Sequence, residues 1–303
     1  MTQEKAPPAP IGVVYDTSMA RADAALALAA LYVAAGRRDA RVNGVCVTGS
    51  SFDAAVFCDI VARVYTGTSR APSSNTALPV GFAADPAARN PLLVGAALSR
   101  TRPDGQPQYV RTIQRLTDTS APDALLRNAV TLTAETIVIL SAPATWMARS
   151  FALADTPGLY RTHVKQILVV EAGDLERDMP AYDAFMQRYV TGSRGPSGSE
   201  PPRPIVSVGR EVGDALSVPL DRIQSMFPPH AVNPVADALA VAHEDVVRLQ
   251  DLAAVHYAVY PNSGFFNLRQ TRLVVDAARR DECLAALVAL ATSRPAAPPA
   301  RGG

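Results

Sequence analysis

Residues 11–31 read IGVVYDTSMARADAALALAAL. A short apolar run over residues 11–15 ends in an aspartate, Asp16, and a polar turn then leads into an alanine- and leucine-rich helix around Asp23. This pattern is typical of α/β proteins, which bind ligands at the carboxyl edge of a parallel sheet. The stretch therefore predicts the fold class, and it places Asp16 and Asp23 at the edge where a site is expected.

Outward from this stretch, short β-rich runs alternate with helical patterns. The alternation predicts an α/β fold with a mostly parallel central sheet flanked by helices, a Rossmann-like open sheet. The apolar run ILVV at residues 167–170 supports it, because both faces of a parallel strand are buried. Strands are predicted at residues 11–15, 42–48, 78–82, 136–140, 164–170 and 204–208. Helices are predicted at residues 22–35, 52–65, 122–130, 145–154, 181–190 and 235–249.

The chain is predicted to end in a small β-hairpin and a helix. The hairpin would join residues 255–260 to residues 271–276 through the turn PNSG, and the helix would span residues 281–291. Residues 11–294 are predicted to form a single domain. Residues 1–10 and 295–303, rich in Pro, Ala and Gly, are predicted to be disordered. The Gly-, Pro- and Ser-rich segment 192–204 is either a lid or a tolerated surface insertion.

Composition and charge narrow the class of protein. Lys and Arg number 29 against 28 Asp and Glu, and no basic stripe is interleaved with aromatic residues, so no nucleic-acid partner is expected. The N-terminus has no apolar signal segment, and no apolar run reaches the length of a membrane span. The cysteines Cys46, Cys58 and Cys283 lie in apolar periodic segments and read as reduced core residues. A cytoplasmic protein without a membrane partner is predicted.

Five stretches, in order, resemble motifs of the inosine–uridine-type nucleoside hydrolases. The family's opening motif DTDPGIDDALAL is similar to DTSMARADAALAL, its AITTVxGN strand and helix to residues 42–65, and its GPLTNxA element to residues 139–148. Its VxxVVxMGG strand is similar to residues 164–173, and its HDPxAVA helix to VADALAVA at residues 235–242. The resemblance implies the fold, hydrolysis of the N-glycosidic bond of a nucleoside or related riboside, and a homo-oligomer.

The resemblance also implies one Ca²⁺ ion at the floor of the pocket, where it would hold a water molecule and the ribose diol. Its ligands would be Asp23, Asp237 and the backbone carbonyl of Thr145. A hard divalent cation takes oxygen ligands and lowers the pKa of a bound water molecule. The family's ribose-binding asparagine falls on Ser50.

Two further positions would contact the substrate. Trp146 occupies the position after Thr145, where the family has asparagine, and it could stack on a nucleobase. The segment that grips the 5′ side of the sugar has Tyr182-Asp183-Ala184 as its nearest counterpart, so Asp183 is the candidate there.

The chain departs from the family where the chemistry would occur. The general-base aspartate is replaced by Ser18, whose hydroxyl is not basic near neutrality, and a ribose-binding aspartate is replaced by Ala22. The base would then be Asp16 or Glu171, and His230 is the candidate leaving-group acid. Two hypotheses follow: metal-assisted hydrolysis with a substitute base, or a non-catalytic homologue that keeps the pocket for a ligand or a protein.

Each of these residues also has a plain structural interpretation. Asp16 could cap the turn after its strand, and Asp23 and Asp237 could be first-turn acids that favour the positive end of a helix. Trp146 could be a packing residue, and Glu171 could point to solvent.

Overall fold

The structure is a computed structural model that describes residues 10–67, 79–171, 178–192, 204–228 and 232–293. An eight-stranded sheet forms its centre, in the order β3-β2-β1-β4-β5-β6-β10-β9. Every neighbouring pair is parallel except β10 and β9, which form an antiparallel hairpin at the edge. A separate antiparallel pair joins β7 to β8. The strands are β1 (Ile11–Thr17), β2 (Ala40–Gly49), β3 (Val80–Ala84), β4 (Thr136–Ser141), β5 (Val164–Val170), β6 (Ile205–Val208), β7 (Ser217–Pro219), β8 (Val246–Arg248), β9 (Phe266–Arg269) and β10 (Arg272–Val275).

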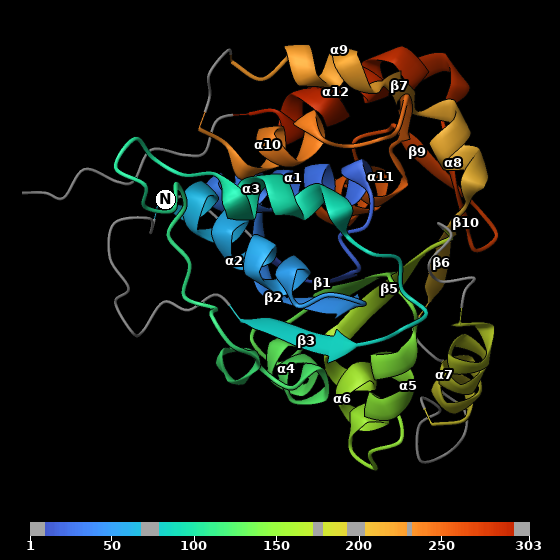
Figure 1. Cartoon of the computed structure of the whole chain (residues 1–303). Coiled ribbons are helices and arrows are strands. Elements are labelled where there is room, and N and C mark those ends of the chain that lie inside the picture. The colour runs from blue at the N-terminus through green and yellow to red at the C-terminus, as the bar shows by residue number, and fades with distance from the viewer. Residues whose placement is uncertain (1–9, 68–78, 172–177, 193–203, 229–231, 294–303) are drawn as a thin grey trace, which may run out of the picture.

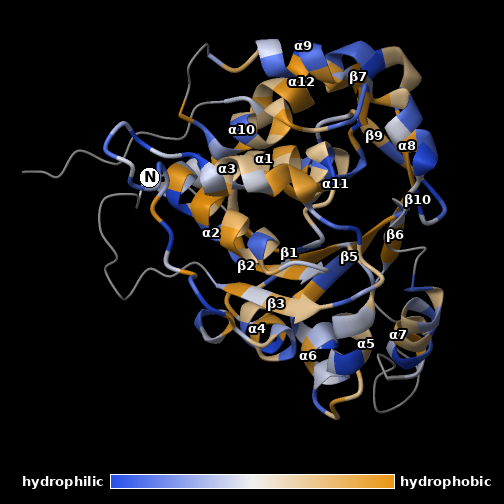
Figure 2. Ribbon diagram, in the orientation of Figure 1, coloured by the Kyte–Doolittle hydropathy of each residue, from blue (hydrophilic) through white to orange (hydrophobic). Residues whose placement is uncertain are grey.

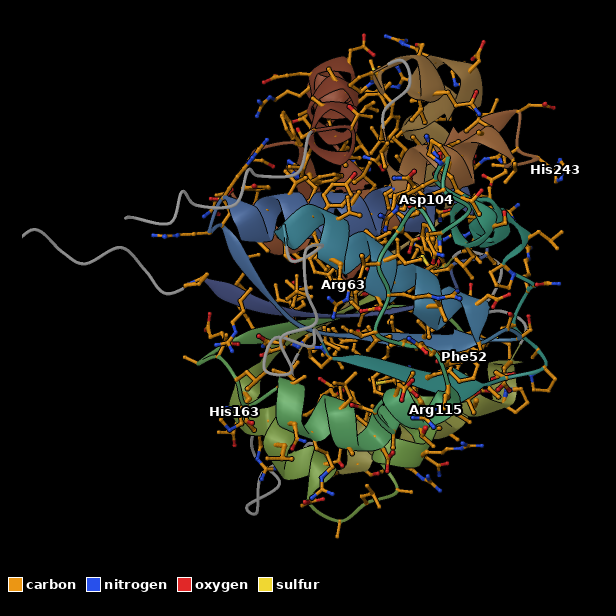
Figure 3. All side chains as sticks on the ribbon, turned by 60° about the vertical axis from the view of Figure 1, so that its left-hand side comes forward. Phe52, Arg63, Asp104, Arg115, His163 and His243 are labelled. Carbon is orange, nitrogen blue, oxygen red and sulfur yellow. The ribbon has the colours of Figure 1, made fainter. Side chains whose placement is uncertain are left out.

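Helices cover both faces of the sheet (Figure 1). On one face lie α4 (Pro122–Ala129), α5 (Thr145–Ser150), α6 (Thr156–His163) and α7 (Met179–Gly192). On the other lie α1 (Ala22–Gly36), α2 (Asp53–Thr66), α3 (Gly95–Ser99), α8 (Arg210–Ala215), α9 (Leu220–Ser225), α10 (Pro234–Ala240), α11 (Gln250–Val259) and α12 (Arg280–Ala291). Asp104 and His243 mark this second layer in Figure 3, and His163 marks the first.

Helix α1 is buried on almost every side. Residues 22–34 are all buried, because the helix packs against β2 and against α2, α11 and α12. A helix that is apolar all round belongs inside a protein rather than on its surface. Figure 2 shows the apolar residues running through the strands and α1, with polar residues on the outlying α8 and α9. Because α1 is internal, the carboxylate of Asp23 in its first turn is internal too.

The predicted fold class is confirmed. The helix predicted at residues 145–154 ends early, at Ser150, and the larger differences lie near the C-terminus. Residues 255–260 are not a strand but the end of α11, and the first hairpin strand is β9. A short apolar run such as VHYAVY does not by its pattern distinguish a strand from a buried helix. The predicted helix 235–249 is also wrong, because α10 ends at Ala240 and residues 246–248 form β8.

Several predictions fall on residues that the structure does not describe. They concern residues 1–9, the tail 294–303, most of the segment 192–204, and His230. Within the described ranges, no helix is both long and apolar enough to cross a membrane.

Candidate functional site

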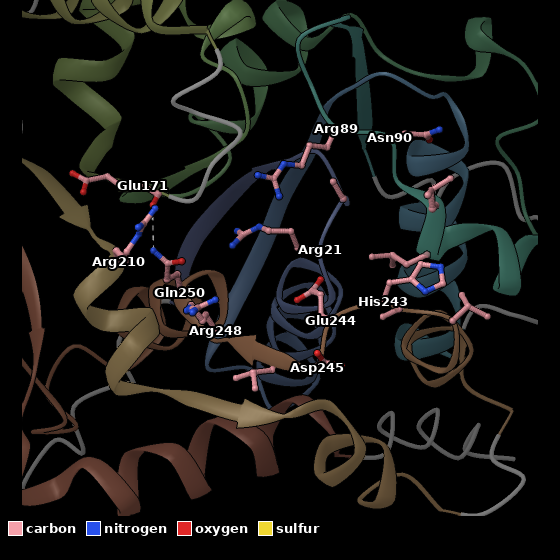
Figure 4. Close-up of a pocket in the computed structure, with 16 residues that line it drawn as sticks. Arg21, Arg89, Asn90, Glu171, Arg210, His243, Glu244, Asp245, Arg248 and Gln250 are labelled. Atoms are coloured by element: carbon pink, nitrogen blue, oxygen red, sulfur yellow. Dashed lines mark hydrogen bonds between the residues drawn. The ribbon is translucent and has the colours of Figure 1, made fainter.

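A pocket of about 780 Å³ opens above the carboxyl ends of the parallel strands. Arg21 comes from the turn after β1, Glu171 directly follows β5, and Arg210 follows β6. With Arg89 and Arg248, the pocket has four arginines in its lining, and Figure 4 shows them around the same space. We call it the arginine pocket. It lies at the carboxyl edge of the sheet, where open α/β sheets bind ligands and where the sequence predicted a site.

One wall of the pocket is the segment 241–248, which leads from the end of α10 through β8. It contributes His243, Glu244 and Asp245 to the lining. The Oε1 atom of Glu244 accepts a hydrogen bond from the backbone N–H of Ala22 at 2.9 Å, which ties this wall to the start of α1. A carboxylate there also satisfies one of the unpaired N–H groups of the first helical turn.

The charged groups of the pocket lining are partly neutralised by groups behind them. Arg248 Nε donates to Asp214 Oδ1 at 2.9 Å. The carboxylate of Glu171 accepts from Arg272 at 3.1 Å and from the hydroxyl of Ser207. A guanidinium has five N–H donors, so an arginine with one carboxylate partner can still donate to a ligand.

The Asp16 carboxylate lies inside the protein, away from the arginine pocket. It is completely buried, and its Oδ1 accepts from Thr48 Oγ1 at 3.0 Å. Its Oδ2 has no hydrogen-bond partner in the described structure, and neither has the indole Nε1 of Trp146. Burial raises the pKa of Asp16 to about 8; the nearby indole N–H of Trp146 and the hydroxyl of Thr48 oppose that rise. Asp16 is therefore held mostly as the neutral acid at neutral pH.

Asp23 lies against a second aspartate, Asp251, at the start of α11. Its carboxylate accepts from the backbone N–H groups of Asp251 at 2.6 Å and Leu252 at 3.1 Å. Arg21 pairs with Oδ2 of Asp251, whose side chain is completely buried. Burial, and next the negative charge of Asp251, raise the pKa of Asp23. Two buried carboxylates and one guanidinium thus form the floor cluster of Arg21, Asp23 and Asp251.

The Asp237 side chain contacts Arg100 and Tyr109 and is not part of the floor cluster. Its Oδ1 pairs with Arg100, and its Oδ2 accepts from the hydroxyl of Tyr109 at 2.5 Å. Burial raises the pKa of Tyr109, and the hydrogen bond to the Asp237 carboxylate adds to this rise. Asp237 lines no part of the arginine pocket and shares no hydrogen bond with Asp23 among the described contacts.

Thr145 and Trp146 begin α5 on the other face of the sheet. The hydroxyl of Thr145 lies within hydrogen-bond distance of the carboxylates of Asp85 and Asp178. The distance from Thr145 Oγ1 to Asp178 Oδ2 is 2.9 Å. The Trp146 side chain is buried to 1% exposure in the core under α5, and it does not line the arginine pocket.

The remaining predicted residues lie at the surface or at the edge of the pocket. Ser50 donates to the carbonyl oxygen of Arg89 at 3.1 Å and lines a smaller hollow that shares Asn90 and Leu92 with the arginine pocket. Asp183 is exposed on α7. Glu171 is the one predicted catalytic residue that lines the arginine pocket.

The residues predicted to hold Ca²⁺ do not fit the ion in this arrangement. Calcium takes six to eight oxygen ligands. Both oxygens of Asp23 accept backbone hydrogen bonds, and Asp237 is paired with Arg100. Across the described part of the chain, no three His, Cys, Asp or Glu side chains gather closely enough to hold a metal ion.

The sequence matches no protein-family model and no curated protein. Its fold is similar to that of the plant nucleoside hydrolase PpNRh1, with a TM-score of 0.62 at 13% identity over 94% of this chain and 99% of that one. It is also similar to an inosine-guanosine nucleoside hydrolase, with a TM-score of 0.58 at 11% identity over 93% and 98% of the two chains. The type III effector XopQ, solved with adenosine diphosphate ribose, has a TM-score of 0.58 at 13% identity over 96% of each chain. The chain therefore has a nucleoside-hydrolase-like fold.

Sequence reasoning missed the acidic partner of Asp23. Asp237 and Asp251 both begin an Asp-x-x-Ala-Val stretch, and the prediction chose Asp237. The second occurrence, QDLAAV from Gln250, was the signal for the residue that the fold places beside Asp23. The four arginines of the pocket lie far apart in the sequence, so no local motif signalled them.

Proposed function

We propose that this chain binds a phosphate-bearing ribosyl compound in the arginine pocket and does not hydrolyse it by metal-assisted attack of water. The single observation that carries the proposal is the set of four arginines around a pocket of about 780 Å³ at the carboxyl edge of the sheet. Pockets of a few hundred to a thousand cubic ångströms suit ligands of nucleotide size.

The chemistry of guanidinium supports a phosphate-bearing ligand. Arginine keeps its charge at all physiological pH values and presents a planar fork of donors that matches two phosphate oxygens. The ribosyl part of the proposal is supported by the nucleoside-hydrolase-like fold and by the effector structure that contains adenosine diphosphate ribose.

The positions of the two candidate bases support binding without hydrolysis. Asp16 is fully buried and lines no part of the pocket. Glu171 lines the pocket, but its carboxylate already accepts hydrogen bonds from Arg272 and from the hydroxyl of Ser207, which hold it away from an attacking water molecule. Hydrolysis with Glu171 as the base is the second candidate function, because its carboxylate is at the pocket.

Calorimetric titration with adenosine diphosphate ribose, ribose 5-phosphate and adenosine tests the ligand class. We expect the two phosphorylated compounds to bind at least about tenfold more tightly than adenosine, a difference of about 1.4 kcal/mol. Arg210→Ala should weaken phosphate-dependent binding, and Arg149→Ala, which changes an exposed arginine of α5 outside the pocket, should not. Equal affinities for all three compounds, or no binding, would contradict the proposal.

An assay of ribose release from a panel of nucleosides, with and without Ca²⁺, tests the second candidate. We expect no turnover in either condition. Turnover that Glu171→Gln abolishes would establish hydrolysis in place of binding alone. The homo-oligomer implied by the family resemblance stays a prediction, to be checked by light scattering of the purified chain.

A further inference from the structure

The floor cluster has the composition of a cation site. Asp23 and Asp251 are both buried, at 1% and 0% exposure, and the Asp23 carboxylate contacts the backbone of Asp251 directly. Two ionised carboxylates this close repel each other in a medium of low dielectric constant, and a positive charge beside them reduces that repulsion.

Arg21 supplies that charge. Its guanidinium pairs with Oδ2 of Asp251, and its charge also acts on Asp23 and on the neighbouring Tyr15. Oδ1 of Asp251 and the hydroxyl of Tyr15 are buried and have no hydrogen-bond partner in the described structure. These two oxygens are ligands of the type that a hard divalent cation takes, whereas both oxygens of Asp23 already accept backbone hydrogen bonds.

We propose that the guanidinium of Arg21 is a built-in cation, which takes the place that a divalent cation would otherwise fill between Asp23 and Asp251. A guanidinium is permanently charged and weakly hydrated, so it tolerates burial better than an ammonium group. The side chain of Arg21 is 16% exposed and lines the arginine pocket, so its charge reaches the ligand space as well as the carboxylates.

The substitution changes what the pocket floor can do. A guanidinium offers hydrogen-bond donors but has no open coordination position, so it holds no water molecule whose pKa is lowered as at a metal. This role of Arg21 does not depend on which ligand fills the arginine pocket. It can fail or hold independently of that ligand, because its test contains no ribosyl compound.

Thermal unfolding of Arg21→Met, with and without millimolar CaCl₂, tests the inference. We expect the variant to have a lower Tm than the wild type and CaCl₂ to raise the Tm of the variant by at least about 4 °C. The wild type should not respond. A Tm increase of the wild type equal to that of the variant, or no increase of the variant, would overturn the inference.

Arg63→Met is the matched control. Arg63 is also buried, and its Nε pairs with one buried carboxylate, that of Asp59, at 3.1 Å. The pair includes no second carboxylate, so Arg63→Met should lose stability without being restored by CaCl₂. Restoration of both variants would show a general effect of the salt and would count against the inference.

A double variant covers the case in which Arg21→Met does not fold. Arg21→Met with Asp251→Asn removes both charges, and we expect it to fold and to ignore CaCl₂. Refolding of Arg21→Met in CaCl₂ but not in its absence supports the inference. Failure of Arg21→Met to fold even in CaCl₂ overturns it, whether or not the double variant folds, because an ion that fills the place of the guanidinium must restore the structure.

Discussion

Asp251 and Asp237 share a sequence pattern but differ in surroundings. Each begins an Asp-x-x-Ala-Val stretch, and each pairs with one arginine. The Asp251 side chain is completely buried beside a second carboxylate, whereas that of Asp237 is 15% exposed and faces a tyrosine hydroxyl. The difference shows that a local pattern predicts an aspartate near a helix start, and that packing decides which one lies beside Asp23.

The largest effect is expected when the buried aspartate is removed. Asp251→Ala leaves the guanidinium of Arg21 without its carboxylate in a mostly buried place, which should cost about 3–5 kcal/mol in the free energy of unfolding. Urea unfolding followed by circular dichroism measures this. A loss below about 1 kcal/mol would mean that the floor cluster is no more than a surface ion pair, and the contrast with Asp237 would disappear.

A smaller loss is expected at Asp23. Asp23→Ala leaves the backbone N–H groups of Asp251 and Leu252 without acceptors, which should cost about 2–3 kcal/mol. The loss is below that of Asp251→Ala because the change also relieves the repulsion between the two carboxylates. Asp23→Asn, which keeps one acceptor oxygen, should recover part of the stability in the same urea experiment. Asp23→Ala unfolding as easily as Asp251→Ala would show that the repulsion is negligible.

The parts of the fold that were predicted from sequence are those with local signals. The strand and helix around Asp16 and Asp23 have a clear pattern, and both residues lie where the edge of a parallel sheet places them. The pairing of Asp23 with Asp251 depends on how α1 and α11 pack, and no local pattern encodes that packing. The same holds for Arg89 and Arg210, which become neighbours of one pocket only because β3 and β6 end at the same edge.

Asp16 is a third buried aspartate, and it has no cation partner among the described contacts. Its contribution to the free energy of unfolding should therefore depend on pH. Its pKa is raised from 3.8 to about 8, so the folded state binds more protons than the unfolded state between these values. The contribution of Asp16 to the stability of the wild type should therefore fall as the pH rises from about 4 to about 8. Asp16→Asn carries no charge and should not show this loss. We expect it to be more stable than the wild type at pH 8, by a margin that shrinks toward zero as the pH falls to 4.

Urea midpoints of both proteins across this pH range measure the difference directly, since the other titrating groups are common to both. A constant difference between the two proteins would contradict the burial of a protonated Asp16. The result would also show whether the stability contribution of a buried carboxylate without a cation depends on pH more strongly than that of the floor cluster.

The smallest effect is expected at Asp237, whose arginine partner is 33% exposed. Asp237→Ala removes partners of Arg100 and Tyr109, and the loss should be about 1 kcal/mol or less, because the ion pair is in contact with solvent. Binding of adenosine diphosphate ribose should not change, because Asp237 lies outside the arginine pocket. Loss of binding in a folded Asp237→Ala variant would show that Asp237, and not only the residues of the arginine pocket, contributes to ligand binding.

The hydrogen bond from the Asp251 backbone to Asp23 joins residues 228 positions apart. A contact of such high sequence separation has a large entropic cost of loop closure, and it cannot form before α11 has been synthesised. A nascent chain can therefore build β1, α1 and much of the sheet while α11 is still being synthesised, with the Asp23 carboxylate unsatisfied. The floor cluster is completed only when α11 docks, so a C-terminal truncation before residue 250 should leave the Asp23 carboxylate without its two backbone donors and Arg21 without the Asp251 carboxylate.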